Sequence, residues 1–316
     1  MSGISITCFA ASYAVAWLLE VTRLFFRSGL RGAFLLGFGG AGLVAHTLYL
    51  AHRAVTSGSA PLSSWYDWLL VAAWILTAMY LYLTLYRRQN PFGLFVLPVI
   101  LLLIGAAVFA GSDKPFPKAS AAQSWGIAHG VFLLLGTVAV LIGFVFGVMY
   151  LIQANRLKRK LLPPRGFHLP SLEWLEQMNE RMIVVSVFML VLGFLAGMVF
   201  NLVNRSVVPW TDPVVWSTSV LVLWMVAAAL FSSFYKPARQ GRKVAYLTVA
   251  SLLFLLLSLG IVLLTDTRHT NPRATAATSP AAANACHPRS TLPVSVEYSR
   301  TWFESSSDDR ALRGPA

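Results

Sequence analysis

The residues best suited to chemistry in this sequence are histidines, because four of its six are expected to lie at one face of a membrane. A neutral imidazole binds haem iron, and aromatic rings pack against a flat macrocycle. Histidines on separate helices with aromatic residues nearby could therefore hold haem. A quinone or another lipid-like ligand would suit the same residues. The four histidines are His46, His52, His129 and His269.

The same predicted face carries tryptophans and a carboxylate. Trp210 and Trp216 flank Asp212 in the segment "PWTDPVVW". Tryptophan is common at any membrane interface, so these two rings could be ordinary anchors. Their combination with the imidazoles favours a ligand site. His46, about two turns inside its apolar run, is the ionisable group best placed within a span and is a candidate for an additional site.

Eight apolar runs must position these side chains. Hydrophobic residues make up 57% of the 316 residues and charged residues 12%, against about 25% charged in a typical soluble domain. Apolar runs of about 18 residues or more predict transmembrane helices, whereas barrel strands would alternate and be shorter. The sequence therefore predicts an all-α integral membrane protein with a bundle of about eight transmembrane helices. The runs are about 4–22, 33–52, 66–86, 93–110, 127–153, 182–203, 214–235 and 243–265.

Basic residues predict how the bundle is oriented. The first, third, fifth and seventh loops between the runs hold fifteen lysines and arginines, and the other three loops hold four. Basic loops stay cytoplasmic, so both termini are expected outside. The net charge of +13 is then a topology signal that also suits anionic lipids, and nucleic acid is not an expected partner. The Ala-, Pro-, Ser- and Thr-rich segment 270–316 predicts a disordered external tail.

The types of residue that are missing narrow the class of function. The two cysteines form no C-x-x-C-H motif, so the chain is not itself a c-type cytochrome. No Asp, Glu, Lys or Arg lies deep within a run, and such residues mark ion and proton pathways. An ion-coupled transporter is therefore disfavoured, although a transporter for another small molecule stays an alternative.

Four segments resemble the CcsA family of cytochrome c assembly proteins, also called ResC. "SGSAPLSSWYDW" keeps the family frame S-G-x-x-P-L-S-x-x-Y-[acid] from Ser57 to Asp67, with Ser59 where the family usually has His. "SWGIAHGVFLLLGTVAVLIGFVFGVMYLIQ" resembles a family helix that opens with a His. "LPSLEWLEQMNERM" resembles the cytoplasmic segment that precedes the next helix, and "GRKVAYLTVASLLFLLLSLGIVLLTDTRH" resembles the final helix. The resemblance spans roughly residues 33–269.

The resemblance implies a set of haem-binding residues. His129 and His269 would be the two external ligands of haem iron; His269 follows Gly260 by nine residues, as in the family. Trp210 and Trp216 would pack on the porphyrin of haem b, and Asp212 would orient a ligand or a propionate-side network.

It also implies a function and partners. The protein would bind haem and present it at the outer face of the bacterial cytoplasmic membrane for attachment to apocytochrome c, beside a ResB/CcsB-like membrane partner. Because the cofactor would supply the chemistry, we expect an assembly component and not an enzyme in its own right.

The expected division of the chain follows the same resemblance. Residues 1–32 hold the first helix and a basic loop, 33–269 the CcsA-like domain, and 270–316 the tail. The family's Trp-rich loop has further tryptophans and a Glu that are absent here, and Ser232 stands near a position where the family has a His. These departures keep open a HemX- or YpjD-like branch, a membrane regulator or scaffold that would act through the cytoplasmic segment 154–181.

The orientation can be tested with reporter fusions. A reporter that is active only outside the membrane should be active when fused after Thr265 and inactive when fused within 155–165, because of the asymmetry of basic residues. The opposite pattern of activity would invert the orientation and remove the histidines from the outer face.

Overall fold

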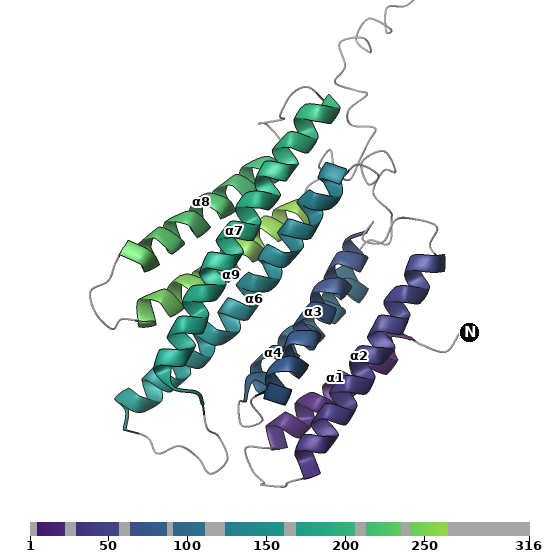
Figure 1. The fold of residues 1–316 in the computed structure, drawn as a ribbon, viewed down its shortest axis with the longest axis vertical. Helices are drawn as coiled ribbons and strands as arrows, with labels where there is room; N and C mark the ends of the chain where they lie inside the picture. The colour runs from purple at the N-terminus through teal and green to yellow at the C-terminus, as the bar shows by residue number, and fades with distance from the viewer. Residues whose placement is uncertain are drawn as a thin grey trace, which may run out of the picture. The chain divides into compact units, whose positions relative to one another are not determined.

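The computed structural model describes residues 5–22, 30–56, 64–86, 91–110, 124–160, 169–205, 213–234 and 241–264 (Figure 1). Every regular element within these ranges is an α-helix, which confirms the predicted all-α class. The helices are α1 (Ile6–Thr22), α2 (Leu30–Thr56), α3 (Trp65–Tyr86), α4 (Phe92–Ala110), α6 (Ser124–Lys158), α7 (Leu172–Arg205), α8 (Pro213–Phe234) and α9 (Gly241–Leu264). The predicted tail 270–316 lies outside the described residues.

Helix length and composition confirm a multi-pass membrane protein. Within the described ranges, the seven helices from α2 onward are long and apolar enough to cross a membrane. The remaining helix, α1, is apolar but has only 17 residues, at the short end of what spans a bilayer. It buries Phe9, Tyr13, Ala16 and Glu20 along one face, so it packs into the bundle as an integral helix.

The helices form two groups of four. In the first quartet, α1 packs against α2 and α4, and α3 packs against the same two helices. In the second quartet, α6 packs against α7 and α9, and α8 against the same two helices. Figure 1 shows the first quartet in purple and blue and the second in teal and green. Helix α6 joins the quartets because it also contacts α3 and α4.

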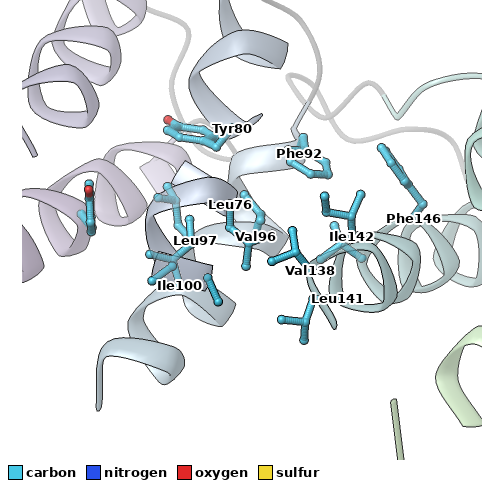
Figure 2. Close-up of a cluster of buried hydrophobic side chains, with 14 of the residues drawn as sticks. Leu76, Tyr80, Phe92, Val96, Leu97, Ile100, Val138, Leu141, Ile142 and Phe146 are labelled. Carbon is cyan, nitrogen blue, oxygen red and sulfur yellow. The ribbon is translucent and has the colours of Figure 1, made fainter. Parts of the chain in front are cut away.

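The seam between the quartets is an apolar layer. Buried side chains of α3, α4 and α6 converge there (Figure 2). The ring of Phe92 in α4 lies 5.3 Å from that of Phe146 in α6, and Phe146 meets Trp174 of α7 edge to face at 5.6 Å. Lipid tails are as apolar as these side chains, so dispersion and close packing hold the layer together.

The longest contact between helices is that of α6 with α7, and glycines bring the two backbones close. A Cβ on Gly136 would lie 2.7 Å from Cγ of Leu190, and one on Gly193 would lie 2.8 Å from Cδ2 of Leu133. The amide nitrogens of these two leucines also lie within about 3.2 Å of the same positions. Each leucine therefore fills a hole that only glycine leaves, as is typical of membrane helix pairs.

Helix α7 begins earlier than the apolar run predicted. The Ser171 hydroxyl accepts a hydrogen bond from the Trp174 N–H at 3.3 Å and caps the helix start. The segment "LPSLEWLEQMNERM" thus forms the first turns of α7 and does not precede the helix. Leu175, Asn179 and Ile183 are buried at four-residue intervals, so one packed face continues through the polar part. Apolarity alone detects only the portion within the bilayer.

The seam generates a stability prediction. Phe146→Ala should destabilise the protein by about 3 kcal/mol, because the ring is fully buried between α4 and α7. Thermal unfolding in detergent measures the loss. Phe109→Ala is the matched control, since that ring of α4 is 92% exposed and should leave the melting temperature nearly unchanged. Equal losses in the two variants would contradict the packing described.

Candidate functional site

His129 lies in the second turn of α6 and its ring is held against α7. The imidazole Nδ1 is 2.7 Å from the carbonyl oxygen of Gly193. A Cβ on Gly197 would lie 2.6 Å from the same Nδ1. The ring thus occupies a notch in α7 at Gly197, beside the Gly193 carbonyl, that any larger residue at position 197 would fill.

This contact fixes which imidazole nitrogen carries the proton. A carbonyl oxygen only accepts hydrogen bonds, so Nδ1 of His129 must donate to Gly193. The neutral ring then has its lone pair on Nε2, the form that coordinates a metal. A hydrogen bond from the other nitrogen to a backbone carbonyl is the usual support for a metal-bound histidine. The chemistry of His129 therefore fits an axial ligand of haem iron.

A second contact reaches the same part of α6 from the first quartet. Trp68, in the first turn of α3, packs over Gly130, where a Cβ would lie 2.6 Å from the indole ring. Trp68 ends the segment "SGSAPLSSWYDW", whose residues 57–63 lie outside the described ranges. The described end of this motif therefore touches the neighbour of His129.

The remaining described residues of the motif tie α3 to α2. Ser64 caps α3 by accepting a hydrogen bond from the Asp67 N–H at 3.2 Å. The Asp67 carboxylate accepts a 2.6 Å hydrogen bond from Nε of Arg53, whose guanidinium lies 4.3 Å from the Tyr66 ring centre. The Tyr66 hydroxyl in turn bonds that of Tyr49 at 2.6 Å. These contacts hold the start of α3 against α2. The end of the bundle that carries His129 is called the outer end, after its predicted orientation.

His46 is fully buried in the first quartet. Its Nδ1 lies 3.3 Å from the Tyr13 hydroxyl, and its ring stacks on Phe9 with centres 4.2 Å apart. Its Nε2 has no hydrogen-bond partner in the described part of the chain. The contacts of His46 are with α1, whereas His129 contacts α7, so no described contact joins the two histidines. The additional site stays a prediction.

The other predicted site residues are less constrained. Trp216, on the first turn of α8, is 63% exposed and offers a free aromatic face. His52 is exposed near the end of α2. Trp210, Asp212 and His269 lie outside the described residues, so the pairing of His129 with His269 stays a prediction.

Sequence reasoning did not single out the residues that hold His129. The Gly-x-x-x-Gly spacing of Gly193 and Gly197 is the signal that could have pointed to the notch, since this spacing marks close helix contacts in membranes. Asn201 was also missed; it is buried, and its side-chain amide donates to the Gly197 carbonyl at 3.0 Å. The asymmetry of basic residues does not reveal that Arg53 pairs with Asp67.

Together, the fold and this site define a multi-pass membrane protein that holds an imidazole against a neighbouring helix at one end of its bundle. A family model for cytochrome c assembly proteins matches residues 62–269. The chain therefore belongs to the cytochrome c assembly protein family, as the resemblance predicted. This membership supports a role in cytochrome c biogenesis.

Individual relatives agree with the family match. Cytochrome c biogenesis protein CcsA of Guillardia theta is 25% identical over 240 residues, covering 69% of this chain and 79% of the relative. Protein HemX of Bacillus subtilis (strain 168) is 27% identical over 218 residues, covering 67% and 77%. CcsA of Chlorella vulgaris is 31% identical over a shorter stretch of 125 residues, covering 38% and 39%. The chain is thus similar to proteins named CcsA and to one named HemX.

Proposed function

We propose that this protein binds haem at the outer end of its helix bundle and presents it for covalent attachment to apocytochrome c. The observation that carries the proposal is the hydrogen bond from Nδ1 of His129 to the Gly193 carbonyl, which leaves Nε2 ready to coordinate iron. Family membership adds the link to cytochrome c biogenesis.

In this proposal, His129 and His269 would hold the iron of haem b. Trp216 has an exposed ring that can pack on a porphyrin face, and Trp210 would add a second aromatic contact. Asp212 would orient a ligand or the propionate side. Haem supplies the redox chemistry when bound, while the protein binds it, orients it and shields one iron ligand within α7.

The location follows from where the haem must be used. Attachment outside the cell needs haem at the outer face, where the basic-residue asymmetry puts the end of the bundle that carries His129. We therefore assign the protein to the bacterial cytoplasmic membrane, working beside a ResB/CcsB-like membrane partner. Residues 33–269 would form the haem-handling domain, preceded by the first helix and basic loop (1–32) and followed by an external tail (270–316).

The ligand assignment is tested by substitution and spectroscopy. The purified protein should show a six-coordinate, low-spin haem spectrum, because two imidazoles occupy the axial positions. His129→Ala or His269→Ala should sharply lower haem content at near-normal protein level, and added imidazole should partly restore it. His52→Ala, an exposed histidine near the same end, is the control and should keep its haem. A double alanine variant of His129 and His269 with unchanged haem content would refute the assignment.

A second candidate function is favoured by the similarity to HemX. In that alternative the protein is a membrane regulator or scaffold that does not export haem and acts through the cytoplasmic segment 154–181. This segment includes the basic last turn of α6, with Arg156 and Lys158, and the first turns of α7. Basic residues there also suit anionic lipid head groups, so their presence alone does not select the regulator.

Two variants separate the alternatives in a host whose c-type cytochromes depend on this protein. The first joins Trp210→Ala to Trp216→Ala; losing both ring contacts should weaken haem affinity roughly ten-fold and lower haem-stained cytochrome c. The second neutralises the four basic residues Arg156, Lys158, Arg159 and Lys160 and should leave cytochrome c intact. Loss of cytochrome c only in the second variant would reject the haem-presenting function and support a regulator.

A further inference from the structure

The notch in α7 holds the His129 ring and also presents a hydrogen-bond acceptor to it. We propose that Gly197 is a positioning residue which, by exposing the Gly193 carbonyl, sets the proton and the rotation of the His129 imidazole before iron binds. The inference rests on the proposed haem-binding function, and it assigns to α7 the control of the ligand carried by α6.

The Gly193 carbonyl is the hydrogen-bond acceptor for the imidazole. In an α-helix the carbonyl of residue 193 points toward residue 197 and accepts a hydrogen bond from the backbone N–H of that residue. A carbonyl oxygen has a second lone pair, and Nδ1 of His129 uses it at 2.7 Å. A side chain at position 197 would stand directly beside that carbonyl. Glycine is therefore required at 197, since a Cβ there would lie 2.6 Å from Nδ1.

The next carbonyl along this part of α7, that of Gly197, already has a side-chain donor. The buried Asn201 side chain donates to the Gly197 carbonyl at 3.0 Å, which takes up the second lone pair of that oxygen. The imidazole uses the Gly193 carbonyl, one turn earlier in α7. The hydrogen bond from His129 to Gly193 thus defines both the position of the imidazole along α7 and its tautomer.

Two further glycine holes along the α6–α7 contact hold leucines. The holes at Gly136 and Gly193 are filled by the apolar side chains of Leu190 and Leu133. Among these contacts His129 is the polar side chain, and it presents one ring edge to a carbonyl. An apolar side chain would fill the hole without needing an acceptor.

The functional consequence lies in the iron ligand. A donated Nδ1 proton makes Nε2 more basic and restrains the ring, and loss of such a supporting contact typically costs about 10- to 100-fold in metal affinity. Gly197→Ala should accordingly lower haem content at least about ten-fold and change the low-spin spectrum and midpoint potential of the haem that remains. Added imidazole should restore the low-spin spectrum.

Gly136→Ala is the matched control for packing. Its new methyl group would meet Leu190 at 2.7 Å in the same helix pair, at a place without a histidine. It should lower stability while leaving the spectrum and potential of the bound haem unchanged. The double variant His129→Ala with Gly197→Ala should bind no less haem than His129→Ala alone, because the glycine acts through the imidazole.

A second measurement removes the steric conflict and probes the hydrogen bond directly. In a His129→Gly variant, free imidazole can bind in the notch and donate to Gly193, whereas 1-methylimidazole coordinated to iron has no N–H to donate. Imidazole should restore the spectrum at about five-fold lower concentration than 1-methylimidazole. In a His269→Gly variant the two compounds should differ less, since the notch is then occupied by His129.

The outcomes distinguish the inference from the function on which it rests. If His129→Ala loses haem but Gly197→Ala keeps the parental haem content, spectrum and potential, the positioning role is overturned and the ligand assignment stands. Equal efficacy of the two imidazoles in the His129→Gly variant would also overturn it. If haem content does not depend on His129 at all, the proposed function itself fails.

Discussion

The structure depends on the close approach of α6 and α7, because a polar ring within a bilayer must find its partner on another helix. Lipid offers no hydrogen bonds, and a buried unpaired imidazole N–H would cost on the order of 1–3 kcal/mol. Most helical carbonyls are already covered by the side chain one turn later. Gly197 uncovers the Gly193 carbonyl, and the neighbouring leucine-in-glycine contacts bring it within 2.7 Å of His129. The same packing thus gives the most extensive helix contact and a hydrogen bond that leaves the proton on Nδ1 and the lone pair on Nε2.

The first quartet supports this arrangement from the other side. Trp68 of α3 covers Gly130, so the turn of α6 that bears His129 is held between α3 and α7. The start of α3 is itself fixed by the Ser64 cap and by the ion pair of Asp67 with Arg53. At the opposite end, Phe92, Phe146 and Trp174 link α4, α6 and α7. Helix α6 is therefore restrained at both ends, and this rigidity suits a metal ligand, whose position must not vary.

The sequence predicts the helices well and the contacts between them poorly, for physical reasons. An apolar run long enough to cross a bilayer has no other stable structure there, so α2 to α9 follow directly from composition. Which faces meet depends on shape: the position of Gly197 in the chain does not reveal that it faces His129, 68 residues earlier. Likewise Asp67 was recognised as a motif residue, but its partner Arg53 was not. The placement of the apolar runs puts His129 among four histidines at one membrane face, and the resemblance implies its role as a haem ligand. His269, Trp210 and Asp212 lie outside the described residues and stay predictions.

Similarity to both CcsA and HemX does not by itself separate haem presentation from a scaffold role, because the identities are nearly the same, 25% and 27%. The energetics of the notch give a separate argument. A scaffold needs only that α6 and α7 pack, and Leu133 and Leu190 show that an apolar side chain fills such a hole without a hydrogen-bond requirement. An imidazole there adds a polar group that must be satisfied and a lone pair that faces away from its only described partner. That lone pair brings no gain to helix packing. In the proposed function Nε2 would gain a partner when it meets an electrophile such as iron, and this is the physical reason for preferring that proposal to a purely structural role.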